Sequence, residues 1–211
     1  MEICLRTRPL SSTKPTETSS ELALIDRCRR QDAEAFGRFM DLYQSRVLGF
    51  VRRMAPQAED ALDITQDVFI RAFQSFANFD GRSAVKTWLF RIAYNLCVDR
   101  ARKQGRTPPV ASLGEPGEPD SIEVSDTRWE PEQAALNVEM NEAVEKAIGS
   151  MSDKLRSVLL LHDREDLAYE EISEMLGIPV GTVKSRLFLA RQFLQSELAP
   201  YLRGELGRQT E

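Results

Sequence analysis

The sequence is poor in the residues that build metal centres, nucleophilic active sites and disulfide frameworks. His162 is the only histidine among 211 residues, so a histidine-rich metal centre or a histidine-dependent catalytic triad has almost nothing to draw on. Cys4, Cys28 and Cys97 are odd in number and form no CxxC pair, which argues against a disulfide framework or a cysteine zinc site. We therefore expect no cofactor and no metal. Of the possible classes of protein, an enzyme is the least supported. We interpret His162 as an exposed residue at a helix end, and Cys28 and Cys97 as small core residues.

Long apolar runs are also missing. No stretch approaches the roughly 18 apolar residues of a membrane-spanning helix, and the N-terminus has no apolar segment of signal-peptide type. We therefore expect no membrane insertion and a location in the cytoplasm. Acidic residues outnumber basic ones by 33 to 28, so a nucleic-acid-binding protein of this composition must gather its basic residues locally.

Helical periodicity is present in two separate parts of the chain. Apolar residues recur at three- and four-residue steps within 43–54, 64–76 and 85–97, and again within 136–151 and 155–161, whereas no alternating strand pattern occurs. The stretch 105–131 holds five of the ten prolines and six acidic residues against two basic ones, which is typical of an extended linker. The sequence therefore predicts an all-α protein of two small helical domains: tail 1–21, domain 22–104, flexible acidic linker 105–131, domain 132–203 and tail 204–211.

The second domain carries the pattern of a helix-turn-helix. Ile172, Met175 and Leu176 give a short helix an apolar face, and Gly177 follows where a residue of positive φ can end that helix. Ile178 can fill the corner and Pro179 suits the opening of the next helix. Three basic residues and no acidic one lie between 179 and 196, whereas 163–174 is strongly acidic. A helix with this charge is expected to enter the major groove by its N-terminal residues.

The first domain carries two faces of opposite charge. Polar residues at 60, 63, 66 and 67 step by three or four along one helix, which keeps them on or near one exposed, mostly acidic face. The next helix has six basic residues against one acid between 85 and 106, interleaved with Trp88, Phe90 and Tyr94. Such a helix suits a surface that meets phosphates and exposed bases, although for Trp88 itself a core position is favoured.

Three stretches together resemble a known family. They are Asp60-Ala-Leu-Asp-Ile-Thr-Gln-Asp-Val-Phe-Ile-Arg-Ala-Phe73, Phe79-Asp-Gly-Arg-Ser-Ala-Val-Lys-Thr-Trp-Leu-Phe-Arg-Ile-Ala-Tyr-Asn95 and Gly181-Thr-Val-Lys-Ser-Arg-Leu187. In this order they look like the extracytoplasmic-function (ECF) group of sigma-70 factors, over about residues 22–200. The resemblance implies an alternative sigma factor, a non-enzyme that binds core RNA polymerase and directs it to specific promoters.

The resemblance also implies a role for individual residues. In the family the first stretch docks on the polymerase β′ clamp, which assigns polymerase binding to Asp60, Asp63, Gln66 and Asp67. The loop 78–83 and the helix after it, with its basic end, match the surface that captures the melted minus-ten element. This match assigns Asn78, Phe79, Asp80, Arg82, Ser83, Lys86, Arg91, Asn95, Arg100, Arg102 and Lys103. The helix that carries the third stretch matches the one that reads the minus-thirty-five element, which assigns Thr182, Lys184, Ser185, Arg186, Phe188 and Arg191. Leu189 departs from the family, which often has a basic residue at that place.

The resemblance further implies partners. Core RNA polymerase, through its β′ clamp and β subunits, and promoter DNA are expected. The acidic linker is expected to thread toward the polymerase active site. An anti-sigma factor, often membrane-attached in this family, would hold the protein inactive near the inner membrane.

Two other interpretations stay open at this point. A helix-turn-helix regulator that binds operators without polymerase would explain 169–194 but neither charged face of the first domain, and it would favour a symmetric dimer. A helical adaptor that binds only proteins would show no salt-dependent DNA binding.

Overall fold

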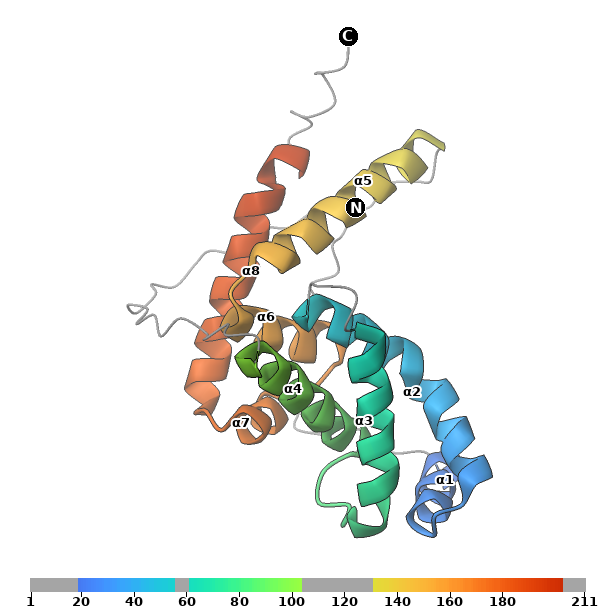
Figure 1. The fold of residues 1–211 in the computed structure, drawn as a ribbon. Coiled ribbons are helices and arrows are strands. Elements are labelled where there is room, and N and C mark those ends of the chain that lie inside the picture. Colours follow the sequence, from blue (N-terminus) through green and yellow to red (C-terminus); the bar gives the residue numbers. More distant parts are fainter. Residues whose placement is uncertain (1–18, 56–60, 104–130, 203–211) are drawn as a thin grey trace.

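The computed structural model describes residues 19–55, 61–103 and 131–202, and it is all-helical over these ranges (Figure 1). The first two ranges form an N-terminal helical unit with α1 (Ser19–Arg29), α2 (Ala33–Met54), α3 (Ala61–Ser75), the 3-10 turn η2 (Phe76–Asn78) and α4 (Val85–Lys103). The third range forms a C-terminal helical unit with α5 (Pro131–Ser150), α6 (Asp153–Leu159), the π-helical turn η3 (Leu160–Arg164), α7 (Tyr169–Leu176) and α8 (Val180–Leu202). The predicted all-α class is confirmed.

Several predicted boundaries fall beside the observed ones. Helix α1 begins at Ser19, inside the predicted tail 1–21, and α5 begins at Pro131, the last residue of the predicted linker. The rest of the linker, residues 1–18 and the tail 204–211 lie outside the described residues. None of the described helices combines the length and apolar character needed to cross a bilayer.

Aromatic side chains dominate the core of the N-terminal unit. Phe39 and Phe76 meet edge-to-face with ring centroids 5.2 Å apart, and Trp88 contacts Phe76 at 5.1 Å. Edge-to-face pairs of this kind add stability beyond the area that they bury. Trp88 is half-buried, as favoured from the sequence. Cys28 and Cys97 are 1% and 4% exposed, which confirms their predicted core positions.

The ends of the helices are held by specific contacts. Asp32 precedes α2 and its Oδ1 accepts a hydrogen bond from the Ala35 amide at 3.1 Å, which satisfies one free donor of the first turn. The C-terminus of α5 is held by Arg156, which is 5% exposed and donates to the carbonyl oxygens of Ile148, Gly149 and Met151. A buried cation at a helix C-terminus also faces the negative end of the helix dipole. Arg156 therefore fixes the turn from α5 into α6.

His162 differs from its predicted exposed position. Its side chain is only 23% exposed, its Nδ1 lies 2.9 Å from the Leu167 carbonyl oxygen, and its ring stacks on Tyr169 with centroids 4.7 Å apart. His162 lies within the π-helical turn η3, whose side-chain directions differ from those of the 3.6-residue periodicity used for the prediction.

Candidate polymerase and nucleic-acid interfaces

The acidic face predicted for polymerase binding lies on α3. Asp63, Gln66 and Asp67 are exposed, whereas Asp60 lies outside the described residues. The same helix exposes two large apolar side chains, Leu62 at 57% and Ile70 at 53%. Leu62, Gln66 and Ile70 are four residues apart, so the acids flank an apolar stripe. Exposed apolar side chains beside charged ones are typical of a protein-docking surface.

The sequence reasoning missed Leu62 and Ile70. Both fall outside the apolar stripe that builds the core, and a second apolar stripe at four-residue steps was the signal that could have found them.

The loop predicted to capture a base, 78–83, connects η2 to α4. Gly81 has φ +73°, a conformation that other residues adopt only with strain, and it turns the chain sharply. Asp80 Oδ1 accepts a hydrogen bond from the Arg82 amide at 3.0 Å, and the two side chains form a 2.9 Å ion pair. Asn78, Asp80 and Arg82 are exposed and Ser83 is half-buried. The polar tip of the loop is therefore accessible from solvent.

Phe79 is the exception in the loop, because it is only 7% exposed. Its ring packs against Phe76 and Trp88, with centroids 6.0 and 5.2 Å away. Arg29 of α1 lies over the same ring at 5.3 Å, and its Nη2 would come within 3.0 Å of a Cβ atom at Gly81. Phe79 thus anchors the loop to the core, and Arg29 packs on the Phe79 ring. Arg29 was not predicted, because it is far from the loop in sequence.

The basic face predicted for the minus-ten element lies along α4. Asn95, Arg102 and Lys103 are exposed, and Arg100 is half-buried. Lys86 and Arg91 are also half-buried, because both contact residues of the C-terminal unit. Burial lowers the pKa of Lys86, and the nearby positive charge of Arg46 lowers it further. Lys86 is therefore partly shielded from solvent by the C-terminal unit.

The C-terminal unit contains the predicted helix-turn-helix. Gly177 has φ +63°, and the turn is closed by the Ile178 amide, which donates to the Ser173 carbonyl oxygen at 3.1 Å. Ile178 packs against the core, as predicted for the corner residue. Pro179 stands just before α8, and its carbonyl oxygen accepts from the amide of Val183 at 3.1 Å. The turn thus presents the N-terminus of α8 at the surface.

The residues predicted to read the minus-thirty-five element follow on α8. Lys184 is exposed, with its Nζ 5.6 Å from the centre of the Tyr169 ring. Thr182, Ser185, Arg186 and Phe188 are half-buried. Arg191 is held by two hydrogen bonds to Asp163, at 2.6 and 3.2 Å. The N-terminal turns of α8 therefore carry the accessible groups.

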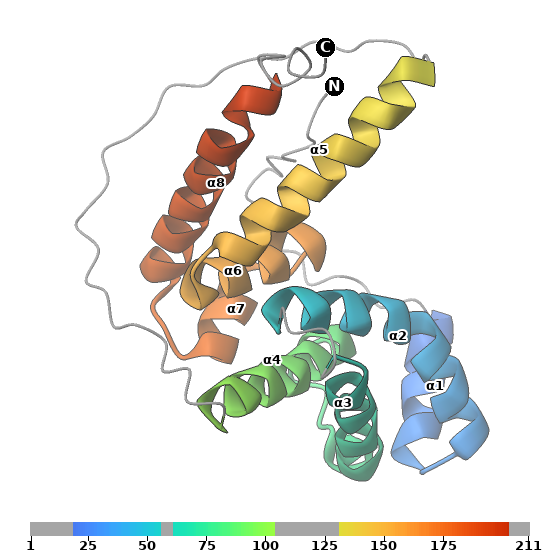
Figure 2. The same cartoon turned by 45° about the horizontal axis from the view of Figure 1, so that its top comes forward.

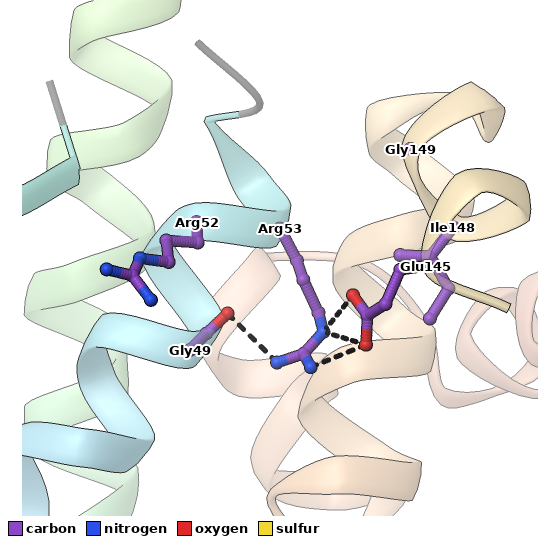
Figure 3. Close-up of a pocket in the computed structure, with 6 residues that line it drawn as sticks. All are labelled: Gly49, Arg52, Arg53, Glu145, Ile148 and Gly149. Carbon is purple, nitrogen blue, oxygen red and sulfur yellow. Dashed lines mark hydrogen bonds and ion pairs between the residues drawn. The ribbon is translucent and has the colours of Figure 1, made fainter. Parts of the chain in front are cut away.

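A pocket of about 280 Å³ lies where α2 meets α5 (Figure 3). Arg53 crosses it and donates to both oxygens of Glu145, at 2.6 and 2.8 Å, while its Nη1 donates to the Gly49 carbonyl oxygen. Arg52 points away from Glu145 (Figure 3). The carboxylate thus already neutralises the guanidinium at this pocket. Within the described ranges, no group of three or more His, Cys, Asp or Glu residues is placed to hold a metal ion.

Comparison with known proteins gives both units a family. The family model described as Sigma-70 region 2 matches residues 39–107, and that described as Sigma-70, region 4 matches residues 141–194. The chain is 38% identical over 184 residues to the RNA polymerase sigma-H factor of Pseudomonas aeruginosa, covering 85% of this chain and 94% of the relative. It is 34% identical over 191 residues to the ECF RNA polymerase sigma-E factor of Escherichia coli K12, covering 89% of this chain and 99% of the relative.

Solved structures share the fold. CnrH, in complex with the cytosolic domain of CnrY, aligns with a TM-score of 0.60 at 22% identity, covering 84% of this chain and 96% of CnrH. The sigma factor RpoE of Bartonella quintana, in complex with the anti-sigma factor NepR, aligns with a TM-score of 0.59 at 23% identity, covering 79% of this chain and 98% of RpoE. An operator-binding regulator is not favoured, because the matches cover both units rather than the helix-turn-helix alone. The chain belongs to the sigma-70 family of RNA polymerase sigma factors, in its ECF group.

Proposed function

We propose that this sigma factor recruits core RNA polymerase through α3 and reads promoter DNA through two separate surfaces. The exposed tip of loop 78–83 and the basic face of α4 take the melted minus-ten element, and the N-terminal turns of α8 read the minus-thirty-five element. The observation that carries this proposal is the separation of charge in the N-terminal unit. One helix exposes acids around an apolar stripe, and another carries the basic residues.

The two surfaces suit different partners. Acids around Leu62 and Ile70 fit a protein surface with basic and apolar patches, and they would repel DNA phosphates. The basic face of α4 attracts phosphates, and a base that leaves the stack at the loop tip offsets part of the cost of melting. The protein thus acts by binding rather than by catalysis.

Two DNA contacts on one chain strengthen each other. Once either unit is bound, the other meets its DNA element at a high effective concentration, so two weak contacts act as one specific site. Polymerase adds a third contact through α3. Promoter choice then depends on all three surfaces together.

An anti-sigma factor is a further proposed partner. The structural relative RpoE is seen with its anti-sigma factor NepR, and its fold is shared by this chain. We propose that such a partner binds this chain in the cytoplasm and, where it is membrane-attached, keeps it near the inner membrane.

The test is run-off transcription with purified sigma-free core polymerase over a library of promoter fragments. The wild-type protein is expected to start transcripts from a defined subset, and Asp63→Ala/Gln66→Ala is expected to weaken them. Glu142→Ala is the matched control, because it removes an exposed acid from α5. If the double variant binds polymerase and transcribes like the control, the assignment of α3 is wrong. If no fragment responds to the wild-type protein, the proposed function as a whole fails.

A further inference from the structure

His162, the only histidine of the chain, lies beside the helix-turn-helix. It belongs to η3, which contacts α7, and Figure 2 shows α7 beside the first turns of α8. The side chain of His162 is only 23% exposed, so its ring is packed against neighbouring residues. These neighbours lead to a residue that is proposed to bind DNA.

One ring nitrogen of His162 holds the turn that leads into α7. Nδ1 lies 2.9 Å from the Leu167 carbonyl oxygen, and because a carbonyl oxygen can only accept, Nδ1 donates. The turn contains Asp166 at φ +52°, a conformation that residues other than glycine rarely adopt. Ala168, just before α7, has no side-chain oxygen that could cap the helix. The start of α7 is therefore held by the His162 hydrogen bond and by Glu171, which accepts from the Ala168 amide at 2.9 Å.

The face of the same ring stacks on Tyr169, the first residue of α7. The ring centroids are 4.7 Å apart and the ring planes are inclined by 27°. Lys184 of α8 places its Nζ over the Tyr169 ring, 5.6 Å from the ring centre. A cation over an aromatic face is attracted by the negative charge density there. His162, Tyr169 and Lys184 thus form a series of contacts from η3 through α7 to α8, which we call the His–Tyr–Lys stack.

The Tyr169 ring is the contact that restrains Lys184. Lys184 is exposed, and within the ranges that the structure describes no carboxylate pairs with it. A lysine side chain has a flexible four-carbon stem, so fixing its ammonium group costs conformational entropy. A ring that favours one position of Nζ before DNA arrives lowers the entropy cost of the DNA contact. The orientation of Tyr169 therefore affects how well Lys184 can bind DNA.

Arg191 of the same helix is held in a different way. Its guanidinium donates two hydrogen bonds to Asp163, at 2.6 and 3.2 Å. His162 Nε2 lies 4.0 Å from Asp163 Oδ1, which is too long for a hydrogen bond. Asp163 thus holds Arg191 without help from His162. A change at His162 is therefore expected to affect Lys184 and to leave Arg191 in place.

We propose that His162 is a positioning residue for DNA recognition. It orients Tyr169, and Tyr169 holds Lys184 where the cation meets the minus-thirty-five element. His162 thus contributes to promoter choice through these two residues rather than by touching DNA. This inference rests on the proposed function in one respect, that Lys184 contacts the minus-thirty-five element.

The test separates the stacked face of the His162 ring from its hydrogen bond. His162→Asn keeps a donor near the place of Nδ1 and removes the aromatic face. His162→Phe is the matched control, because it keeps an aromatic face for Tyr169 and removes the donor. If the stack positions Lys184, the phenylalanine variant behaves like the wild type and the asparagine variant does not.

The first readout needs no DNA. In the full chain with isotope-labelled lysine, the NMR signal of the Lys184 Hε protons is expected upfield of that of the exposed Lys146, because an aromatic ring shields protons above its face. Lys184→Ala identifies the signal by its absence. His162→Asn is expected to move the signal toward that of Lys146, and His162→Phe is expected to leave it upfield. A Lys184 signal that His162→Asn does not move would overturn the proposal.

The second readout is the binding of polymerase holoenzyme to fluorescent duplexes of a promoter found by run-off transcription. His162→Asn is expected to weaken binding about two- to fivefold, and His162→Phe is expected to bind like the wild type. In a Lys184→Ala background, His162→Asn is expected to have no further effect. In an Arg191→Ala background it should weaken binding by the same factor as in the wild type, because the effects of independent sites add.

The outcomes distinguish the stack from the proposed function. If His162→Asn weakens binding equally with and without Lys184, or if His162→Phe binds as weakly, His162 only supports the helix-turn-helix and the proposal is overturned. If the Lys184 signal moves but promoter affinity does not change, the role in DNA recognition is overturned. If wild-type holoenzyme starts from no promoter, the proposed function fails, whereas the Lys184 signal of the free protein still decides whether His162 positions Lys184.

Discussion

Arg46 and Glu165 lie 119 residues apart in the chain, yet Arg46 Nη2 is 2.8 Å from Glu165 Oε2. Arg46 comes from α2 and Glu165 from the turn before α7. Glu165 is almost fully buried by this contact, whereas the Arg46 side chain is 40% exposed. A buried carboxylate needs a partner, because leaving water costs it more free energy than most single contacts return. The pair therefore joins the two helical units.

The first prediction concerns this pair and pH. Burial raises the pKa of Glu165, and the charge and hydrogen bond of Arg46 oppose the rise. A raised carboxyl pKa gives stability that is complete below the unfolded value and lost as pH rises through the folded value. Arg46→Ala removes the charge and hydrogen bond that oppose the rise, so the pKa of Glu165 in the folded protein rises further. The loss of stability with rising pH therefore extends to higher pH.

We expect Arg46→Ala to cost about 1–2 kcal/mol at pH 7, after allowance for the solvent exposure of Arg46, and less at pH 4.5. Urea unfolding at the two pH values measures the difference. Arg38→Ala is the control, since it removes an exposed arginine of the same helix that pairs with the exposed Glu34. An equal cost at both pH values would contradict the role of the Glu165 charge.

The second prediction concerns Arg29 and the loop 78–83. Arg29→Ala removes the cation above the Phe79 ring, a contact of about 0.5–1 kcal/mol. We expect two- to fivefold weaker binding of single-stranded minus-ten DNA by polymerase holoenzyme, because the loop loses its support. Arg30→Ala, an exposed neighbour, should leave the affinity unchanged. If the two variants weakened DNA binding equally, Arg29 would contribute only its positive charge and not support of the loop.

The third prediction concerns the exposed start of α8. Lys184→Ala or Arg186→Ala should cost about 1–3 kcal/mol at one base position if the side chain reads a base, and act uniformly over sequences if it contacts phosphate. Binding of holoenzyme to promoter fragments with single changes in the minus-thirty-five element distinguishes the two cases. Lys146→Ala on α5 is the control, because it removes an exposed cation away from α8. If neither Lys184→Ala nor Arg186→Ala changed promoter affinity, the assignment of α8 to the DNA interface would be wrong.

The fourth prediction concerns the buried thiols. Burial raises the pKa of Cys28 to about 11 and that of Cys97 to about 12. At pH 8 only about one thiol in a thousand at Cys28 would be thiolate, and fewer at Cys97, so both should resist alkylation in a Cys4→Ser background. Unfolding in urea should expose both to rapid reaction. Rapid labelling of the folded protein at pH 8 would show that the N-terminal core opens readily.

The same thiols affect stability at high pH. Because their folded pKa values are raised, their contribution is complete below the unfolded value of about 8.5 and falls as pH rises toward 11–12. Cys97→Ala should therefore show a flatter loss of stability above pH 9 than the parent protein. Chemical unfolding between pH 8 and 10.5 measures this slope.

Local features of this protein were predictable from its sequence. Apolar residues three and four positions apart identified most of the described helices, since neighbours on a helix face are close in sequence. Gly177 was predicted to end a helix, and it does so with φ +63°. Cys28 and Cys97 were expected in the core and are buried there. The family followed from three ordered motifs, and the comparisons confirm it.

Other features escaped the sequence because they depend on contacts between distant segments. The apolar stripe of Leu62 and Ile70 is an exception, because its four-residue spacing was visible in the sequence and was passed over in favour of the acids beside it. The support of Phe79 by Arg29 joins residues from different helices. His162 was expected to be exposed, but it lies in a π-helical turn and its ring stacks on Tyr169.

By itself the sequence determined which helices form and where their charges lie along the chain, because helix periodicity and capping act over a few residues. It left the relative position of the two units open. Only the tertiary structure decided that the acids of α7 lie on the basic face of α4, with Glu174 paired to Arg91. The physical reason is that charge complementarity between surfaces depends on how whole helices pack, and no local pattern records which face meets which.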